Sequence, residues 1–198
     1  MTHKILVLTL ILASFCLFSC KNSKQTAKYE QIQYVIQKSG FIKLPLEFDA
    51  NIDVLKSNYS ISRTSNDTLL FWEDGIYNII GFLPDTANYY AFLHLTVGDM
   101  LYPTIVTMDK NWQKIDEKII CAAGCTGLVQ VDVINCYDSV WIYKDLKIKS
   151  ISKVIGTVEN EDSTSQVLNI CNMITLDGLI DKNGKINIKE SALIDCSK

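Results

Sequence analysis

The densest group of reactive side chains in the sequence is a cysteine loop. Cys121–Cys125 (CAAGC) holds two thiols with a three-residue gap, and Cys136 follows in the same stretch. Three thiolates with Cys171 as a fourth ligand would suit zinc, although the gap is wider than the two-residue spacing usual in zinc knuckles. We interpret the loop as pinned by a disulfide, with zinc or reduced thiols as alternatives, and expect no metal or other cofactor.

Five cysteines after residue 20 are candidates for disulfide bonds. An odd number allows at most two bridges within one chain and leaves one thiol over, and the sequence leaves the connectivity open. The candidates are Cys121, Cys125, Cys136, Cys171 and Cys196.

Histidine chemistry would depend on one residue. His94 is the only imidazole beyond His3, and it lies in Tyr90–Thr96 (YAFLHLT), where strand alternation places it opposite Leu93 and Leu95. A serine or cysteine nucleophile would need this imidazole as its base, and the sequence has no GxSxG or HExxH motif. We interpret His94 as a strand residue that hydrogen-bonds locally, and we expect a protein that is not an enzyme.

The acidic residues are scattered and form no catalytic pattern. Asp181–Gly184 (DKNG) has its glycine at the fourth position and lacks a glutamate at the twelfth, so a hairpin turn fits better than a calcium loop. Thr86 and Ser163 each follow an aspartate in a predicted loop. These tripeptides resemble the short O-glycosylation sequon of Bacteroidetes, which makes both hydroxyls candidates for modification.

The start of the chain has the layout of a secretory signal. Lys4 precedes an uncharged run over residues 5–19, which is shorter than the roughly 20 residues that span a bilayer. Leu17–Cys20 (LFSC) resembles the bacterial lipobox, with Phe18 bulkier than the usual occupant. The resemblance implies that residues 1–19 are a lipoprotein signal peptide and that Cys20 carries the lipid, which anchors the protein in a membrane.

Residues 20–25 read as a polar tether, and residues 26–198 as a single β-rich domain with an N-terminal helix. Lys21–Lys24 (KNSK) lacks both the acidic residue that retains lipoproteins at the inner membrane and the acidic cluster of surface-exported ones. By this resemblance we expect an outer membrane lipoprotein that faces the periplasm rather than the cell surface.

Composition describes a globular body. The chain is 48% hydrophobic, has three prolines and nine glycines, and carries a net charge of −3. Arg63 is the only arginine, and the sequence has no basic block. Nucleic acid is therefore not an expected partner.

Hydrophobic periodicity predicts one helix followed by strands. Residues 26–38 place Tyr29, Ile32 and Ile36 on one helical face, and Gly40 is the expected stop. After it, β-branched and aromatic runs alternate with turn residues. The predicted strands are Phe41–Phe48, Val54–Ser62, Thr68–Trp72, Tyr77–Leu83, Tyr89–Thr96, Tyr102–Met108, Lys114–Ile120, Leu128–Ile134, Ser139–Tyr143, Ile148–Val158, Gln166–Thr175 and Lys185–Ile188.

The short connections require antiparallel pairing, so the fold class is all-β: an antiparallel meander forming a sandwich or a barrel. Asp109, Asp145 and Asp181 lie 36 residues apart, each at a strand–turn–strand, which leaves a small β-propeller as the alternative. Convergent hairpin chemistry explains the spacing better. Because Trp112 stands where a glycine is usual, we expect that turn to be of another type.

Several segments together resemble small outer membrane lipoproteins of Bacteroidetes. The resemblance covers most of residues 41–190 and implies an envelope setting, but it supplies no activity. The segments are Lys43–Leu46 (KLPL), Ile80–Pro84 (IGFLP), Tyr89–Tyr90, Val106–Asn111 (VTMDKN), Lys144–Ile148 (KDLKI) and Asn183–Ile186 (NGKI).

Two functional hypotheses follow. The first is a lipid-anchored lipoprotein that acts by binding, as an accessory to an outer membrane or surface assembly. The second is a carrier of a small ligand or an enzyme inhibitor, with the aromatic strands Tyr89–Phe92 and Tyr102–Met108 lining a cavity. Core packing is the simpler use of those strands.

Overall fold

The structure is a computed structural model that describes residues 30, 32–49, 59–60, 78–84, 87–97, 101–122, 132–159 and 167–196. These residues contain a short helix, residues 32–39, followed by strands. The strands are β1 (Leu46–Asp49), β2 (Tyr59–Ser60), β3 (Asn78–Phe82), β4 (Tyr90–Val97), β5 (Leu101–Met108), β6 (Lys114–Ile119), β7 (Asp132–Ile142), β8 (Lys147–Glu159), β9 (Val167–Ile180), β10 (Ile186–Glu190) and β11 (Ile194–Asp195).

The strands form two antiparallel sheets, as the sequence predicts. Sheet A has the order β2-β3-β4-β5-β6, and sheet B has the order β1-β7-β8-β9-β10, with β11 also paired to β9. Most sheet neighbours are consecutive in the chain, which is a meander. Neither sheet closes on itself within the described residues, so the fold is the sandwich and neither the barrel nor the propeller.

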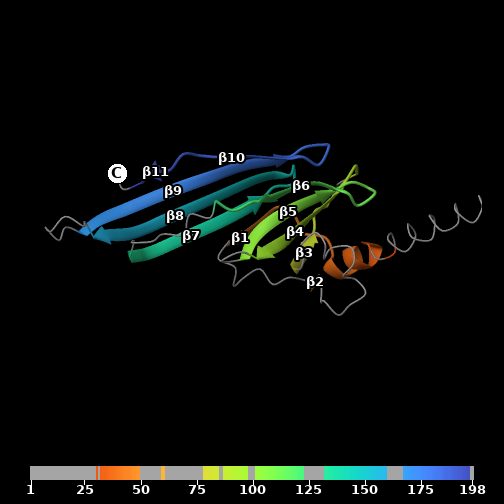
Figure 1. Cartoon of the computed structure of the whole chain (residues 1–198), viewed down its shortest axis with the longest axis horizontal. Helices are drawn as coiled ribbons and strands as arrows, with labels where there is room; N and C mark the ends of the chain where they lie inside the picture. Colours follow the sequence, from red (N-terminus) through yellow and green to blue (C-terminus); the bar gives the residue numbers. More distant parts are fainter. Residues whose placement is uncertain are drawn as a thin grey trace, which may run out of the picture.

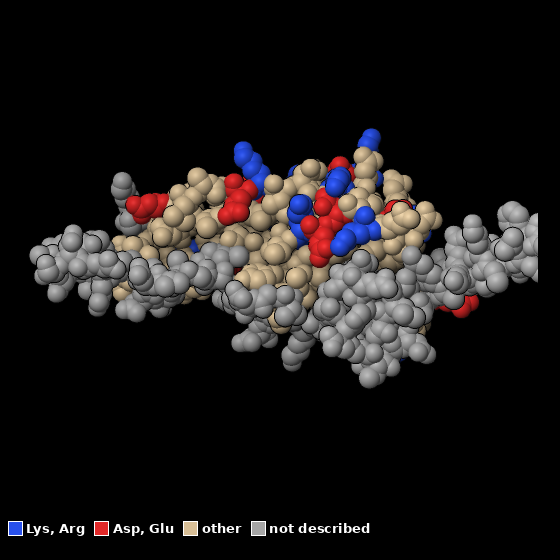
Figure 2. Space-filling view, viewed as in Figure 1, with Lys and Arg blue, Asp and Glu red and all other residues tan. Residues whose placement is uncertain are grey.

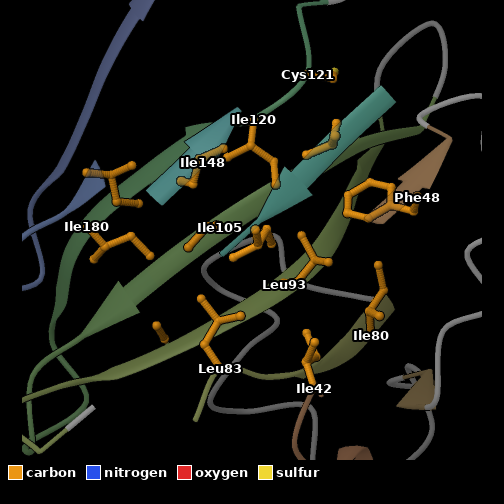
Figure 3. Packing of buried hydrophobic residues seen from close by; sticks show 14 of the residues in the cluster. Ile42, Phe48, Ile80, Leu83, Leu93, Ile105, Ile120, Cys121, Ile148 and Ile180 are labelled. Atoms are coloured by element: carbon orange, nitrogen blue, oxygen red, sulfur yellow. The ribbon is translucent and has the colours of Figure 1, made fainter. Parts of the chain in front are cut away.

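A single apolar core joins the two sheets. Leu93 and Ile105 of sheet A are fully buried against Val140, Ile142 and Ile148 of sheet B. Figure 3 shows Leu93, Ile105 and Ile148 gathered between the strands. Burial of this much apolar surface is the main force that holds the sheets together.

The helix covers the other face of sheet A. Ile32 and Val35 pack on Phe92 and Val106, which alternate along β4 and β5 with the residues of the first core. Sheet A is thus buried on both faces, and the molecule has three layers: helix, sheet A and sheet B. Figure 1 shows the helix beside sheet A, while β7, β8 and β9 run on beyond it at the far end.

Gly40 ends the helix, as predicted. It adopts a φ of 72°, and its N–H donates to the carbonyl of Ile36 at 2.8 Å, which satisfies one of the last helical acceptors. Of the predicted helical face, Ile32 is fully buried and Ile36 partly so, whereas Tyr29 lies outside the described residues. Among the described residues, no helix combines the length and apolar character needed to cross a bilayer.

The strands differ from the prediction in three places. The strand predicted from Phe41 begins at Leu46, after the cis Leu44–Pro45 bond, and before it Phe41 only bridges to Phe82. The described part of the predicted strand 128–134 and most of the predicted strand 139–143 belong to one strand, β7. The residues between them pair with β8 in continuous register, and the only register shift between these two strands lies between Val133 and Asn135. β11 is an unpredicted strand.

Two hairpin turns share one geometry. Asp109 and Asp181 each accept two backbone N–H donors at 2.7–3.0 Å through the same carboxylate oxygen, from the residues two and four positions later. Each turn ends on a residue with positive φ, Gly184 at 82° and Trp112 at 63°. The expectation that Trp112 changes the turn type is therefore wrong.

Tertiary packing holds Trp112 in this conformation. Its ring stacks on Tyr90 at 4.9 Å and meets Phe82 edge-on at 6.4 Å, so the burial of the indole offsets the strain of a left-handed backbone. In the third hairpin the turn begins at Tyr143, and Leu146 takes the positive φ. Asp145 is therefore not equivalent to the other two aspartates, and the 36-residue spacing is not a structural repeat.

Polar contacts from the β9–β10 turn reinforce the packing of the two sheets. The Thr107 hydroxyl donates to the carbonyl of Gly184 at 2.6 Å, and the N–H of Ile186 donates to Asp116 Oδ2 at 3.1 Å. Burial alone would raise the pKa of Asp116, but the N–H groups of Ile186 and Glu117 and the ammonium of Lys185 hold it below its ordinary value. The turn therefore fixes the register of one sheet against the other.

Charged side chains cover β6, which is an edge strand of sheet A. Lys114 pairs with Glu117 at 3.0 Å, and Lys185 reaches Asp116 at 3.4 Å. Figure 2 shows acidic and basic side chains gathered over this part of the molecule. Such charges discourage another chain from pairing with the edge.

We predict that Gly184→Ala destabilises the protein more than Gly40→Ala. Both glycines have positive φ, which costs alanine about 1–2 kcal/mol. A Cβ at position 184 would also lie 3.0 Å from Ile115 and 3.1 Å from Tyr89, whereas nothing lies within 4 Å at position 40. Urea unfolding should show an additional loss of about 1 kcal/mol or more for Gly184→Ala, and equal losses would contradict the packing described above.

Candidate binding surfaces

Sheet B presents one face to solvent. Because side chains alternate along a strand, the residues next to the core residues Val140 and Ile142 point away from sheet A. We call this the outer face of sheet B and define it by these residues of β7 and by their cross-strand partners on β8 and β9. Its residues are Tyr137, Trp141, Tyr143, Lys147, Lys149, Ile151, Lys153, Met173, Thr175, Asp177 and Leu179, with Ser139 on the same face but buried.

The outer face of sheet B carries a column of aromatic residues beside a column of lysines. Trp141 lies opposite Lys149, and Tyr137 lies opposite Lys153. Tyr137 is 46% exposed and Tyr143 39%, values that are high for aromatic side chains on a sheet. Aromatic rings fixed on a rigid sheet and open to solvent are the residues that anchor protein–protein contacts.

A second candidate is a groove between the helix and sheet A. It has a volume of about 280 Å³ and is mostly apolar. Phe41, just after the helix, is 70% exposed at its rim. The lining residues are Ile36, Phe41, Phe82, Leu83, Ala87, Tyr90 and Lys110.

Among the described lining residues, one side chain is charged. The Lys110 ammonium donates to the carbonyl of Tyr89 at 3.0 Å and lies 4.0 Å from the centre of the Tyr90 ring. Burial lowers the pKa of Lys110 below its ordinary value. The hydrogen bond and the cation–π contact hold the ammonium in place at the apolar wall.

Most residues of the two strands that were predicted to line a carrier cavity lie in the core instead. Of the segment Tyr89–Phe92, Tyr90 lines the groove, whereas Tyr89 and Ala91 belong to the core between the sheets. Val106 and Met108 pack under the helix. Most of the two aromatic strands serves packing, and sequence reasoning missed the contribution of Lys110 and Phe41.

His94 lies on the face of sheet A opposite Leu93 and Leu95, as predicted, and it is fully buried. The nearest carboxylate oxygen, on Glu117, is 3.7 Å from Nε2, and neither ring nitrogen has a hydrogen-bond partner among the described residues. The predicted local hydrogen bond is therefore absent from the described part. Burial lowers the pKa of His94 to about 4, an effect that Glu117 offsets only in part.

Asp138 is a buried carboxylate on the inner face of sheet B, in the row next to Val140. Burial raises its pKa, although a hydrogen bond from Ser152 opposes the shift, and Asp49 adds to it. The sequence alone gives no sign that Asp138 is buried. Only the register of β7 against β8 shows that it faces inward.

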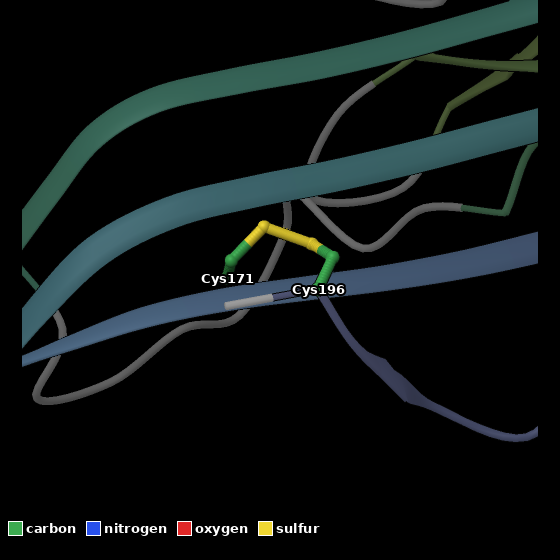
Figure 4. The surroundings of a disulfide bond; sticks show 2 residues. All are labelled: Cys171 and Cys196. Atoms are coloured by element: carbon green, nitrogen blue, oxygen red, sulfur yellow. A yellow bond between two sulfur atoms is a disulfide. The ribbon is translucent and has the colours of Figure 1, made fainter. Parts of the chain in front are cut away.

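Two of the five disulfide candidates are bonded to each other near the C-terminus. Cys171 of β9 joins Cys196 across 25 residues, and the Cys196 N–H donates to the Cys171 carbonyl at 2.8 Å (Figure 4). Closing such a loop stabilises a fold by about 3.5 kcal/mol in the chain-entropy account. With its sulfur in this bond, Cys171 cannot be the fourth zinc ligand considered above.

The other cysteines differ in their surroundings. Cys121 is not disulfide-bonded, and its thiol is buried in the core between the sheets. Cys136 is disulfide-bonded. The predicted sites Cys20, Cys125, Thr86 and Ser163 lie outside the described residues. Within the described ranges, no three His, Cys, Asp or Glu side chains gather to hold a metal ion.

Comparisons with known proteins found no match to a family model, a curated protein or a solved structure.

We predict that the stability of the protein falls as the pH drops from about 6.5 to about 4, in part because of His94. The folded state keeps the imidazole neutral and the unfolded state protonates it at the ordinary pKa of 6.5, so this contribution is complete above pH 6.5. The loss amounts to about 3 kcal/mol at the lower end.

Urea unfolding of the wild type and His94→Gln at pH 7, 5.5 and 4 measures the effect. The difference in unfolding free energy between the two proteins should change across this range. Parallel losses in both proteins would show that His94 does not contribute.

Proposed function

We propose that this protein is a lipoprotein of the bacterial envelope that is anchored by a lipid on Cys20. It acts by binding a protein of an outer membrane or surface assembly, and it does so through the outer face of sheet B. The observation that carries the proposal is the aromatic column Tyr137, Trp141 and Tyr143, in which both tyrosines are exposed and Trp141 is half-buried.

The composition of the outer face favours a protein partner. Tyrosine and tryptophan are enriched at the centres of interfaces, where they bury large areas with little loss of side-chain freedom. The neighbouring Lys149 and Lys153 can lay their alkyl stems beside the rings and keep their charges in water. Leu179 and Ile194, each 41% exposed, extend the apolar surface across β9 and β11.

The layer order supports this choice of face. The chain from Cys20 enters the described structure at Glu30, beside the helix on the remote side of sheet A. A tether attached at that layer leaves the outer face of sheet B directed away from the point of attachment. This is the orientation that an accessory protein needs to present a binding surface.

The disulfide between Cys171 and Cys196 supports an exported location. Such bonds persist in oxidising compartments such as the periplasm and are rare in the cytoplasm. Together with the lipobox-like Leu17–Cys20, it favours an outer membrane lipoprotein facing the periplasm.

The anchoring step predicts that Cys20→Ser abolishes lipid attachment. A hydroxyl cannot replace the thiolate that is alkylated, so cells fed radioactive palmitate should label the wild type and not the variant. Cys121→Ser is the matched control, because it removes a thiol without touching the lipobox, and it should be labelled as the wild type is. Equal label in the wild type and Cys20→Ser would remove the anchor from the proposal.

The binding step predicts a discrete crosslinked adduct when a photoreactive phenylalanine analogue replaces Tyr137 in living cells. Tyr34 on the helix is the matched control, since it is also a tyrosine and is similarly exposed, at 42% against 46%. Trp141→Ser should reduce the Tyr137 adduct about tenfold, because losing a buried aromatic anchor costs an interface 1–2 kcal/mol or more.

Adducts of equal yield at both positions would indicate nonspecific contact and contradict the assigned face. Absence of any adduct at Tyr137, with the variant present at wild-type levels in the membrane fraction, would contradict it as well.

A further inference from the structure

The outer face of sheet B has a charge opposite to that of the whole chain. The chain carries a net charge of −3. On the outer face, however, β8 carries Lys147, Lys149 and Lys153. Among the residues that define the face, Asp177 of β9 alone is acidic, and Lys189 of β10 lies opposite it and extends the same row. Lysines gathered on one face of an acidic protein create a local positive potential there.

Most of these ammonium groups are not neutralised within the described part of the chain. Lys147 pairs with Asp145 at 2.7 Å, but the two side chains are 65% and 55% exposed, so water screens the pair. The other ion pairs of the described residues all involve β6 of sheet A. Lys149, Lys153 and Lys189 make no ion pair there, which leaves their charges available to a binding partner.

The register of β7 against β8 puts these charges beside the aromatic column. Lys149 lies opposite Trp141, and Lys153 lies opposite Tyr137. Neighbouring strands are about 4.8 Å apart, so a surface that covers the rings also covers the two lysines. Removing an ammonium group from water is costly unless the partner supplies an opposite charge. A partner that uses the rings as anchors must therefore present carboxylates next to its apolar contact.

We propose that the partner of the outer face of sheet B is a protein with an acidic contact surface, whose carboxylates pair with Lys149 and Lys153. This inference rests on the function proposed above and specifies the chemistry of the partner. Asp177 favours a protein over an anionic membrane or polysaccharide. A uniformly anionic surface would repel this carboxylate, whereas a protein can offer it a hydrogen-bond donor.

The test measures the yield of the Tyr137 photo-adduct with the full-length protein in isolated envelope membranes. Mass spectrometry identifies the crosslinked peptide, which we expect to come from a protein segment rich in aspartate and glutamate. Raising NaCl from about 0.1 to about 1 M shortens the Debye length from about 10 Å to about 3 Å. The yield should fall about threefold over this range, because screening weakens the attraction between the two surfaces.

Charge variants assign this salt dependence to particular residues. Lys149→Glu combined with Lys153→Glu should lower the yield about tenfold and remove its decrease with salt. Lys149→Arg combined with Lys153→Arg keeps both charges and should preserve the yield. Asp177→Asn removes the one acidic group and should raise it. Lys118→Glu on the exposed edge strand β6 is the matched control and should behave as the wild type does. Circular dichroism melting establishes that each variant is folded.

The outcomes separate the partner's chemistry from the binding function. A protein adduct at Tyr137 that neither salt nor the double glutamate variant changes would overturn the acidic partner and leave the binding face intact. Equal losses in that variant and in Lys118→Glu would overturn the role of Lys149 and Lys153. A lipid or polysaccharide adduct would replace the protein by that class of partner. Absence of any adduct at Tyr137 would overturn the proposed function and this inference together.

Discussion

The burial of sheet A on both faces is the constraint on which the rest of the structure depends. β4 and β5 carry apolar side chains at successive positions, such as Phe92 with Leu93 and Ile105 with Val106, so neither face can remain in water. Sheet B covers one face and the helix covers the other. The groove and the outer face of sheet B take their positions from this requirement.

The packing buries several polar side chains, which differ in how well the structure satisfies them. Thr107 is buried but satisfied, because it donates to Gly184 and so links the sheets. His94 and Asp138 are buried at an electrostatic cost, which is why the pKa of the first is lowered and that of the second raised. Neither lies on the outer face of sheet B or in the groove, so neither of these buried groups contributes to a candidate binding surface.

The two surfaces also divide the molecule into sides. The groove and the helix lie on one side of sheet A, and the outer face of sheet B lies on the far side of the other sheet. The C-terminal disulfide holds β11 against β9, at the edge of the outer face.

Three features could be predicted from the sequence alone: the helix that ends at Gly40, the antiparallel all-β class and the hairpin at Asp181. They are predictable because hydrophobic periodicity and turn chemistry depend on residues close together in the chain. Tertiary structure alone decided that Trp112 adopts a left-handed backbone, since the ring contacts that offset the strain come from Tyr90 and Phe82. It also decided which cysteine Cys171 meets, and that Lys110 lies beside Phe41 in one groove. Those contacts join residues far apart in the chain, and no local pattern encodes them.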